Sequence, residues 1–195
     1  MRDLSSKRVL VEILEENGKR LTNQMVQSAI HGNIRFLDSD HYLRKQVTGG
    51  ANQKLIDSET KIVDGVSTFK GTQFDPDRVE IIEKIKIGYD TDPAEGKEGA
   101  LKYQKALSNV YRNARLKISQ SGKLLGEFPF SRLGNKYAGN SIEDDFRRLK
   151  HPIVLVGGSD IEIEIVFPKG VTNTVTDYEY LELETSGVTV FRKES

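Results

Sequence analysis

Some residue types and patterns are missing or scarce in this chain of 195 residues. There is no cysteine, which excludes a disulfide framework, a thiolate metal site and a cysteine nucleophile. There is no tryptophan, and the three histidines (His31, His41 and His151) are too far apart in sequence to pair on one helix turn or strand. No apolar run approaches the roughly 18 residues of a membrane span, and Met1-Arg2-Asp3 does not open a signal peptide. We therefore expect a soluble, non-secreted protein with little catalytic equipment.

Net charge is also absent, but the two signs are unevenly distributed along the chain. The 29 basic residues balance the 29 acidic ones. Residues 101–150 hold 11 basic and 4 acidic residues, whereas residues 151–195 hold 3 and 8. These blocks predict either a basic and an acidic surface that lie side by side in one fold, or complementary patches that meet between copies of the protein. The zero net charge disfavours a free nucleic-acid-binding protein, because such proteins are more often basic overall.

Residues 1–50 follow the period of helices and are predicted to form a helical N-terminal arm. Ser5-Ser6 is expected to cap one short helix, and Thr22 a second that ends at Gly32. Asp38-Ser39-Asp40 is expected to cap a third helical turn that runs to Val47. Helices this short are not stable alone, so the arm needs the main domain, a neighbouring subunit or a lipid surface as its partner. Residues 51–68 are predicted to be a linker.

From about Phe69 the period changes from 3.6 to 2, which is typical of strands. We expect residues 69–195 to form an antiparallel β-sandwich of about seven or eight strands. In the strand expected at 160–167, four apolar residues alternate and should face the core: Ile161, Ile163, Ile165 and Phe167. Other strands are expected at 79–89, 116–119, 124–130, 152–156, 178–184 and 188–192. The hairpin strand that contains Pro129 should lie at an edge or carry a bulge, because proline lacks a ladder donor.

Two short helical insertions and one further hairpin complete the expected fold. The insertions are predicted over residues 100–111 and 141–149, the second capped by Ser141. Thr185-Ser186-Gly187 is expected to join the last two strands as a hairpin turn. Tyr180-Leu181 shifts the phase of the alternation, which predicts a bulge there.

Two groups of carboxylates could carry chemistry, but a structural role is favoured for both. Glu162 and Glu164 lie on one strand face about 7 Å apart, and paired carboxylates at that distance could serve glycoside hydrolysis. Alternation already explains them as the wet face of an amphipathic strand. Asp90, Asp92 and Glu95 could hold a calcium ion on a turn, but EF-hand spacing is absent, so a solvated turn is favoured.

The remaining candidates are also weak. Gly157-Gly158-Ser159 opens no helix, so it lacks the geometry of a phosphate loop. None of the histidines lies in a nucleophile elbow, and there is no His-x-His strand of the cupin type. Basic residues near Tyr111 and Phe130 could bind nucleic acid or form a subunit contact: Arg112, Arg115, Lys117, Lys123, Arg132 and Lys136. We therefore predict no catalytic residues, no metal or cofactor site, no cofactor and no enzymatic activity.

A helical arm, strands with long insertions and paired closing strands together resemble the jelly-roll coat proteins of tailless icosahedral viruses. The resemblance is architectural, and three segments carry it: Arg78–Asp90, Ala114–Leu133 and His151–Arg192. Within the second segment, Ala114–Phe130 is similar in style to capsid strands of small bacteriophages with upright β-sandwiches. The double-barrel coat proteins need about sixteen strands, twice the eight of one jelly roll, so the resemblance implies a single jelly roll.

The resemblance implies a structural virion protein, a capsid subunit that is either the major coat protein or a vertex (penton) protein. Such a subunit is made in the host cytoplasm, assembles with itself as a symmetric homo-oligomer and with other capsid proteins, and has no small-molecule substrate. Contact of the arm with nucleic acid or membrane stays open. The alternative is a carbohydrate- or ligand-binding β-sandwich module. Tyr178 and Tyr180 share a strand face that could serve it, although tryptophan, the preferred sugar platform, is absent.

Overall fold

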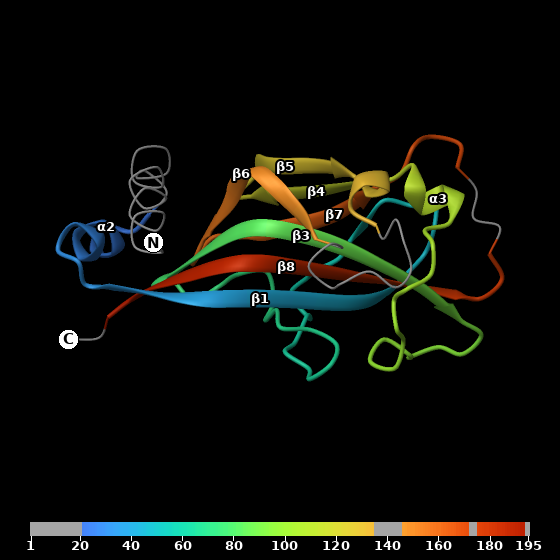
Figure 1. Cartoon of the computed structure of the whole chain (residues 1–195), viewed down its shortest axis with the longest axis horizontal. Helices are drawn as coiled ribbons and strands as arrows, with labels where there is room; N and C mark the ends of the chain where they lie inside the picture. The colour runs from blue at the N-terminus through green and yellow to red at the C-terminus, as the bar shows by residue number, and fades with distance from the viewer. Residues whose placement is uncertain (1–20, 135–145, 172–174, 194–195) are drawn as a thin grey trace.

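Two four-stranded antiparallel sheets form the body of the protein in this computed structural model (Figure 1). The structure describes residues 21–134, 146–171 and 175–193. The large sheet has the order β1-β8-β3-β6, with β1 (Ile34–Val47), β8 (Tyr178–Arg192), β3 (Arg78–Asp92) and β6 (Arg147–Val156). The small sheet has the order β2-β7-β4-β5, with β2 (Gln53–Lys54), β7 (Ile161–Val166), β4 (Arg115–Gln120) and β5 (Lys123–Pro129). The expected mainly-β class with antiparallel sheets is confirmed.

One hydrophobic core receives side chains from both sheets. Ile85 of β3 and Leu183 of β8 contribute to it from the large sheet, and Ile118 of β4 and Ile163 of β7 from the small one. In β7 buried and half-buried residues alternate strictly, so the expected inward face is confirmed, and Phe167 just after the strand is buried too. Full burial of such side chains stabilises the fold by about 1.5–3 kcal/mol each.

The hairpin of β4 and β5 lies where the sequence predicts it. Ser121 and Gly122 form its turn with φ of 49° and 77°, and two positive φ values suit the right-handed twist of the flanking strands. β5 is an edge strand that ends at Pro129, so the missing donor removes no interior ladder bond. The β4–β5 register also shifts between Ile118 and Ser119.

Helix α2 (Asn23–Ile30) is the one helix of the expected arm that lies in the described part of the chain, and Thr22 caps it as predicted. The helix expected after Ser5-Ser6 lies outside the described residues. Met25 is buried in a small apolar cluster with Val79 and Val190 on the outward face of the large sheet, near the end where β1 begins (Figure 1). No helix in the described ranges is long and apolar enough to cross a membrane.

The helical prediction for residues 38–47 is wrong, because residues 34–47 form strand β1. Its pairing with β8 runs without a break from Ile34 opposite Arg192 to Val47 opposite Glu179. Leu43 and Val47, the apolar pair behind the prediction, are four residues apart. That spacing fits one helix face and, being even, one strand face as well. β2 lies at residues 53–54, so the sheets include chain that the sequence analysis assigned to the arm and the linker.

The first helical insertion is largely wrong, and so is the described end of the second. Within residues 100–111 only the end is helical, as part of the four-residue helix α3 (Asn109–Arg112), and the chain before it runs along the end of β3. There Lys105 N–H donates to the Tyr89 carbonyl, and Tyr103 has a φ of 56° that no helix allows. Residues 141–145 of the second insertion lie outside the described residues, but its end is strand, since β6 begins at Arg147.

The predicted hairpin at Thr185-Ser186-Gly187 is wrong as well, because β8 is one continuous strand of 15 residues. Gly187 lies in mid-strand opposite a bulge in β3, where Glu83 is the extra residue between Ile82 and Lys84. A Cβ at Gly187 would lie 1.9 Å from the Ile81 carbonyl oxygen, so the glycine permits a close backbone approach and not a turn. The bulge expected at Tyr180-Leu181 is absent from the regular β8 register.

Candidate functional site

Glu162 and Glu164 lie on the solvent side of β7 and are held by lysines of neighbouring strands. Lys54 of β2 donates to Glu162 at 2.8 Å, and Lys117 of β4 lies 3.6 Å from Glu164. The hydrogen bond and charge of Lys54 hold the pKa of Glu162 below its usual value. The two carboxylates thus belong to separate ion pairs on the solvent side of the small sheet.

Asp90, Asp92 and Glu95 do not converge on a common point. Asp90 accepts the Tyr103 backbone N–H at 3.2 Å and lies 3.0 Å from Lys105. Burial works to raise the pKa of Asp90, but the contact with Lys105 and backbone hydrogen bonds outweigh it and lower that pKa. Asp92 accepts from its own turn at Ala94, and Glu95 is exposed. Among the residues that the structure describes, no three histidine, aspartate or glutamate side chains are placed to hold a metal ion.

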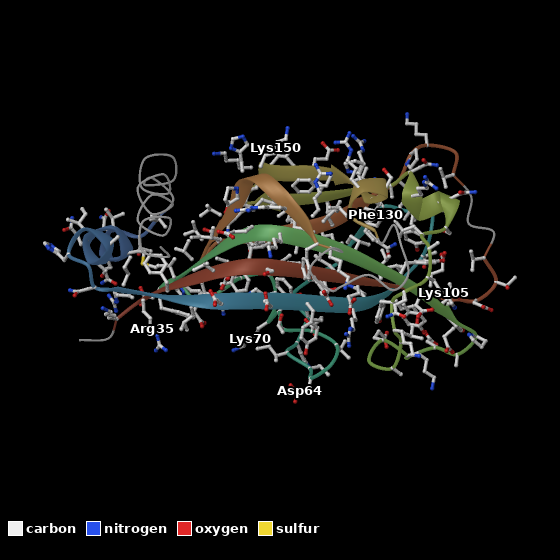
Figure 2. The ribbon with its side chains drawn as sticks, viewed as in Figure 1. Arg35, Asp64, Lys70, Lys105, Phe130 and Lys150 are labelled. Atoms are coloured by element: carbon white, nitrogen blue, oxygen red, sulfur yellow. The ribbon has the colours of Figure 1, made fainter. Side chains whose placement is uncertain are left out.

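The basic residues between 112 and 136 do not form an aromatic-lined nucleic-acid surface. Tyr111 and Phe130, the two rings expected near them, are fully buried; Phe130 is labelled beside β4 and β5 in Figure 2. Arg115 is paired with Glu127 at 2.7 Å, and Lys117 with Glu164 as described above. The remaining members either point to solvent from different elements, as Arg112, Lys123 and Arg132 do, or lie outside the described residues, as Lys136 does.

The other two sequence candidates have structural roles. Gly157 closes the connection from β6 to β7: its N–H donates to the Arg78 carbonyl, and a Cβ there would lie 1.8 Å from the Asp75 carbonyl oxygen. Tyr178 and Tyr180 share a face of β8 as predicted, but only Tyr178 is exposed. The Tyr180 hydroxyl donates to the Ala94 carbonyl at 2.8 Å beneath the loop after β3, so the two rings form no joint platform.

Two buried carboxylates close the two ends of the core. At one end Glu80 is only 2% exposed, accepts from Ser39 and Thr189, and pairs with Arg78. His41 lies 3.4 Å from Glu80, with its ring 5.5 Å from the rings of both Phe69 and Phe74.

At the other end Glu179 is buried and accepts hydrogen bonds from the Tyr89 and Tyr111 hydroxyls at 2.7 and 3.2 Å. Burial together with the nearby carboxylate raises the pKa of both tyrosines. These two clusters connect strands of the large sheet to each other and to the loops. The carboxylate in each cluster is hydrogen-bonded to neighbouring side chains, so we assign both clusters a structural role.

The outward face of the large sheet carries a polar array that the sequence analysis missed. Side chains at even positions of β1 and β8 point outward, because Leu43, Leu181 and Leu183 point into the core. β3 presents even positions outward after its bulge. The register then places three rows side by side, each running from β1 across β8 to β3: Asp40, Ser186 and Lys84; Tyr42, Glu184 and Lys86; Arg44, Glu182 and Gly88.

The third row of the polar array is an ion pair of half-buried Arg44 with buried Glu182. Arg44 Nε donates to Glu182 at 2.7 Å, and its guanidinium also donates to the Gly65 carbonyl at 2.7 Å. The guanidinium lies 5.3 Å from the ring centre of Tyr103, which packs over Gly88. Burial and the neighbouring Glu184 carboxylate raise the pKa of Glu182, and Arg44 opposes them. This row ties the sheet to the loops that follow β2 and β3.

Residues of the first two rows, all but Lys86, line a pocket of about 320 Å³. Glu184 and Ser186 of β8 lie between Asp40 and Tyr42 of β1 on one side and Lys84 of β3 on the other. Phe146, just before β6, completes the far wall. The Lys86 ammonium lies 3.3 Å from Glu184 and 5.7 Å from the centre of the Phe146 ring. We regard this concave, partly aromatic and charged surface as the candidate functional site.

No local sequence pattern indicates this pocket, since its walls come from residues about 140 positions apart. The available signal was alternation, with polar residues at 182, 184 and 186 along one strand and at 40, 42 and 44 along another. The second set was assigned to a helical turn. No protein-family model matches the chain, and no curated protein matches it significantly.

Proposed function

We propose that the chain is a single jelly roll that serves as a structural subunit of an icosahedral virion shell, as major coat or vertex protein. The observation that carries this proposal is the nesting of the strand pairs. β1 pairs with β8, β2 with β7, β3 with β6 and β4 with β5. This is the pairing of one long hairpin folded over into two sheets, as in the eight-stranded jelly rolls of viral capsid and lectin domains.

The distribution of charge on the two sides of the large sheet supports contacts between copies. The edge strand β6 exposes Arg148, Lys150 and His151. The loop between β2 and β3 exposes more acidic than basic residues, with Asp57, Glu59, Asp64 and Asp75 against Lys61 and Lys70. Figure 2 shows Asp64 on the side of the molecule opposite Lys150. Complementary patches on opposite sides favour head-to-tail contacts, which close into rings around a rotation axis.

Two further surfaces can contact a neighbouring copy: apolar residues of the same loop and the backbone of the edge strand β6. Ile62 and Val63 at the loop tip are 62% and 48% exposed. β6, as an edge strand, presents unpaired backbone groups that a neighbouring copy can cover. In this proposal the chain has no enzymatic activity and no cofactor, and it works as one copy among many.

The test uses the full-length chain and a charge-reversal cycle. Light scattering and electron microscopy should show large closed particles of the natural sequence at low salt. Lys150→Glu alone and Asp64→Lys alone should each reduce assembly, and the double variant should restore it, because the contact is then re-formed with exchanged signs. High salt should weaken assembly, since exposed charges are screened beyond about 8–10 Å.

Two outcomes would contradict the proposal at different levels. Assembly that is unchanged in both single variants would remove these two patches from the contact. A chain that stays strictly monomeric at high concentration, in low and high salt alike, would contradict the shell itself. Lys123→Glu, an exposed reversal in the β4–β5 hairpin, is the matched control and should leave the contact between β6 and the loop intact.

A second candidate function is a carbohydrate- or ligand-binding module, and the pocket on the polar array specifically favours it. Jelly rolls are also the architecture of lectin domains. The pocket lies on the outward face of the large sheet, and it needs no contribution from another copy. Binding and assembly are therefore separate properties that different measurements report.

A further inference from the structure

We infer that the pocket on the polar array binds a single neutral sugar ring. The inference deepens the second candidate function, on which it rests, and is independent of shell assembly. Ligand pockets in proteins have volumes of about 300–1,000 Å³. At about 320 Å³ this pocket lies at the small end of that range, which suits one ring and not an extended oligomer.

Two aromatic side chains stand on opposite sides of the pocket. Tyr42 lies on β1 and Phe146 directly precedes β6, and these two strands are separated by β8 and β3. Three strand spacings of about 4.8 Å place their backbones about 14 Å apart, which leaves room for a ligand ring between the two side chains. Aromatic faces carry partial negative charge and attract the C–H groups of a sugar.

The Tyr42 wall is fixed before any ligand arrives. Its hydroxyl accepts the Gly65 backbone N–H at 3.0 Å, and the Arg44 guanidinium lies 5.4 Å from its ring centre. Arg44 is itself held by Glu182 and by the Gly65 carbonyl. A wall held in this way loses little conformational freedom on binding, which favours affinity for a small ligand.

The polar groups of the floor and rim match hydroxyl groups. The carboxylates of Asp40 and Glu184 accept hydrogen bonds only, the Lys84 ammonium donates only, and the Ser186 hydroxyl does both. A sugar hydroxyl both donates and accepts, so neighbouring hydroxyls of one ring can satisfy acceptors on one side and a donor on the other.

The charges around the pocket select against a charged ligand. Asp40 and Glu184 are balanced by Lys84 and by Lys86, which lies 3.3 Å from Glu184. An anion in this space would lie against the carboxylates of Asp40 and Glu184, and a cation against the Lys84 ammonium. A neutral ligand avoids both conflicts and carries no charge that must be desolvated.

Saturation-transfer NMR on the full-length protein tests the inference. The probes are methyl α-mannopyranoside, methyl β-glucopyranoside and methyl β-galactopyranoside at millimolar concentration, with N-acetylneuraminic acid and L-serine as an acidic and a zwitterionic probe. We expect transfer to the ring protons of at least one methyl glycoside. Tyr42→Ala and Phe146→Ala should each weaken binding about tenfold or more, as loss of an aromatic anchor does.

One variant serves as the control, and circular dichroism of every variant checks the fold. Tyr178→Ala removes an exposed tyrosine of β8, the strand that supplies Glu184 and Ser186, at a position outside the pocket and should change nothing. Tyr42→Phe keeps the ring but loses the hydroxyl that accepts the Gly65 N–H, so it should weaken binding less than Tyr42→Ala does. If Tyr42→Ala does not fold, Phe146→Ala alone decides, because Phe146 is only partly buried.

The outcomes separate the ligand class from the binding function. Transfer that is unchanged in a folded Phe146→Ala protein would place the sugar elsewhere and overturn the inference. Transfer only to N-acetylneuraminic acid or only to L-serine would overturn the neutral class and keep a binding module. Transfer to none of the five probes would overturn both, while light scattering of the same samples still reports assembly.

Discussion

At the scale of single residues, one close backbone contact of the large sheet depends on the absence of a side chain. Gly187 faces the Ile81 carbonyl across the bulge at Glu83, at a distance that no Cβ tolerates. The contact lies in mid-strand with pairing on both sides, so neither backbone can move away without loss of register.

Gly187→Ala should therefore destabilise the protein by about 1–3 kcal/mol, as overpacking of a core does. The matched control is Gly99→Ala, where a Cβ would meet Val66 at an ordinary 3.6 Å. That control should change the free energy of unfolding by less than about 0.5 kcal/mol. Urea unfolding of the two variants measures the difference, and equal effects would contradict the role of Gly187.

A second prediction at this scale concerns pH and Glu80. Burial works to raise the pKa of this carboxyl, but hydrogen bonds from His41 and Thr189 and the nearby charges of His41 and Arg78 outweigh it and lower that pKa. Because the folded pKa lies below the ordinary value of 4.5, the carboxylate's stabilisation is present above about that pH. It is lost as the pH falls through the folded pKa.

Glu80→Gln should accordingly cost about 1.5–3 kcal/mol at neutral pH, the range for hydrogen bonds to a charged group. The cost should shrink as the pH is lowered below the ordinary carboxyl value, since the natural side chain is then protonated as well. Urea unfolding of both proteins across this pH range measures it. A difference between them that does not change with pH would contradict the assignment.

At the scale of elements, α2 packs against the described part of the fold through one side of its surface. Met25 is 3% exposed against Val79 and Val190, whereas Ile30 is 62% exposed. Met25→Ala should lower the free energy of unfolding by about 2–5 kcal/mol, because the helix stays docked until the sheets unfold. Ile30→Ala should be nearly neutral. Thermal unfolding of the two variants checks the contrast, and equal small effects would show that α2 detaches before the sheets unfold.

Elements with a local signal could be predicted, and elements decided by distant pairing could not. The alternation of β7 and the hairpin strands expected at 116–119 and 124–130 depend on a few neighbouring residues each, and both predictions are confirmed. β1 is decided by β8, some 140 residues away, and its Leu43–Val47 spacing fits both periods. The same holds for Gly187. Its sequence context predicts a turn, but the glycine is required by a bulge in β3, a different strand.

The candidate site was even harder to predict from local sequence patterns than the strands were. The exposed ion pairs of Glu162 and Glu164 agree with the predicted wet face of a strand, because alternation alone determines which side they occupy. The pocket needs β1, β8 and β3 in register and Phe146 at the start of β6. No pattern within one segment indicates that combination.

At the scale of the whole molecule, the nested pairing demands that distant segments meet before either sheet is complete. The innermost pair, β4 with β5, closes over a two-residue turn, but the outermost pair joins Ile34 to Arg192. Each successive strand pair, from the innermost to the outermost, must overcome the entropy cost of closing the chain between its strands. Refolding of the full chain should therefore take milliseconds to seconds, the range of proteins dominated by non-local strand pairs.

Stopped-flow refolding after dilution from urea measures this rate. Gly126→Ala in the innermost hairpin and Met25→Ala at the periphery offer a comparison of early and late contacts, since Gly126 packs beside the Phe128 ring. Refolding in microseconds would contradict an order in which distant strands have to pair.

The pairing of β1 with β8 also brings two remote points of the chain together. Lys193 N–H donates to the Asn33 carbonyl at 3.0 Å, directly beside the pair of Ile34 and Arg192. The polypeptide therefore enters and leaves the large sheet through a single corner. A reporter peptide inserted just before β1 and one attached just after β8 would leave the fold at the same place. In a ring of identical copies, both peptides would lie on the same rim.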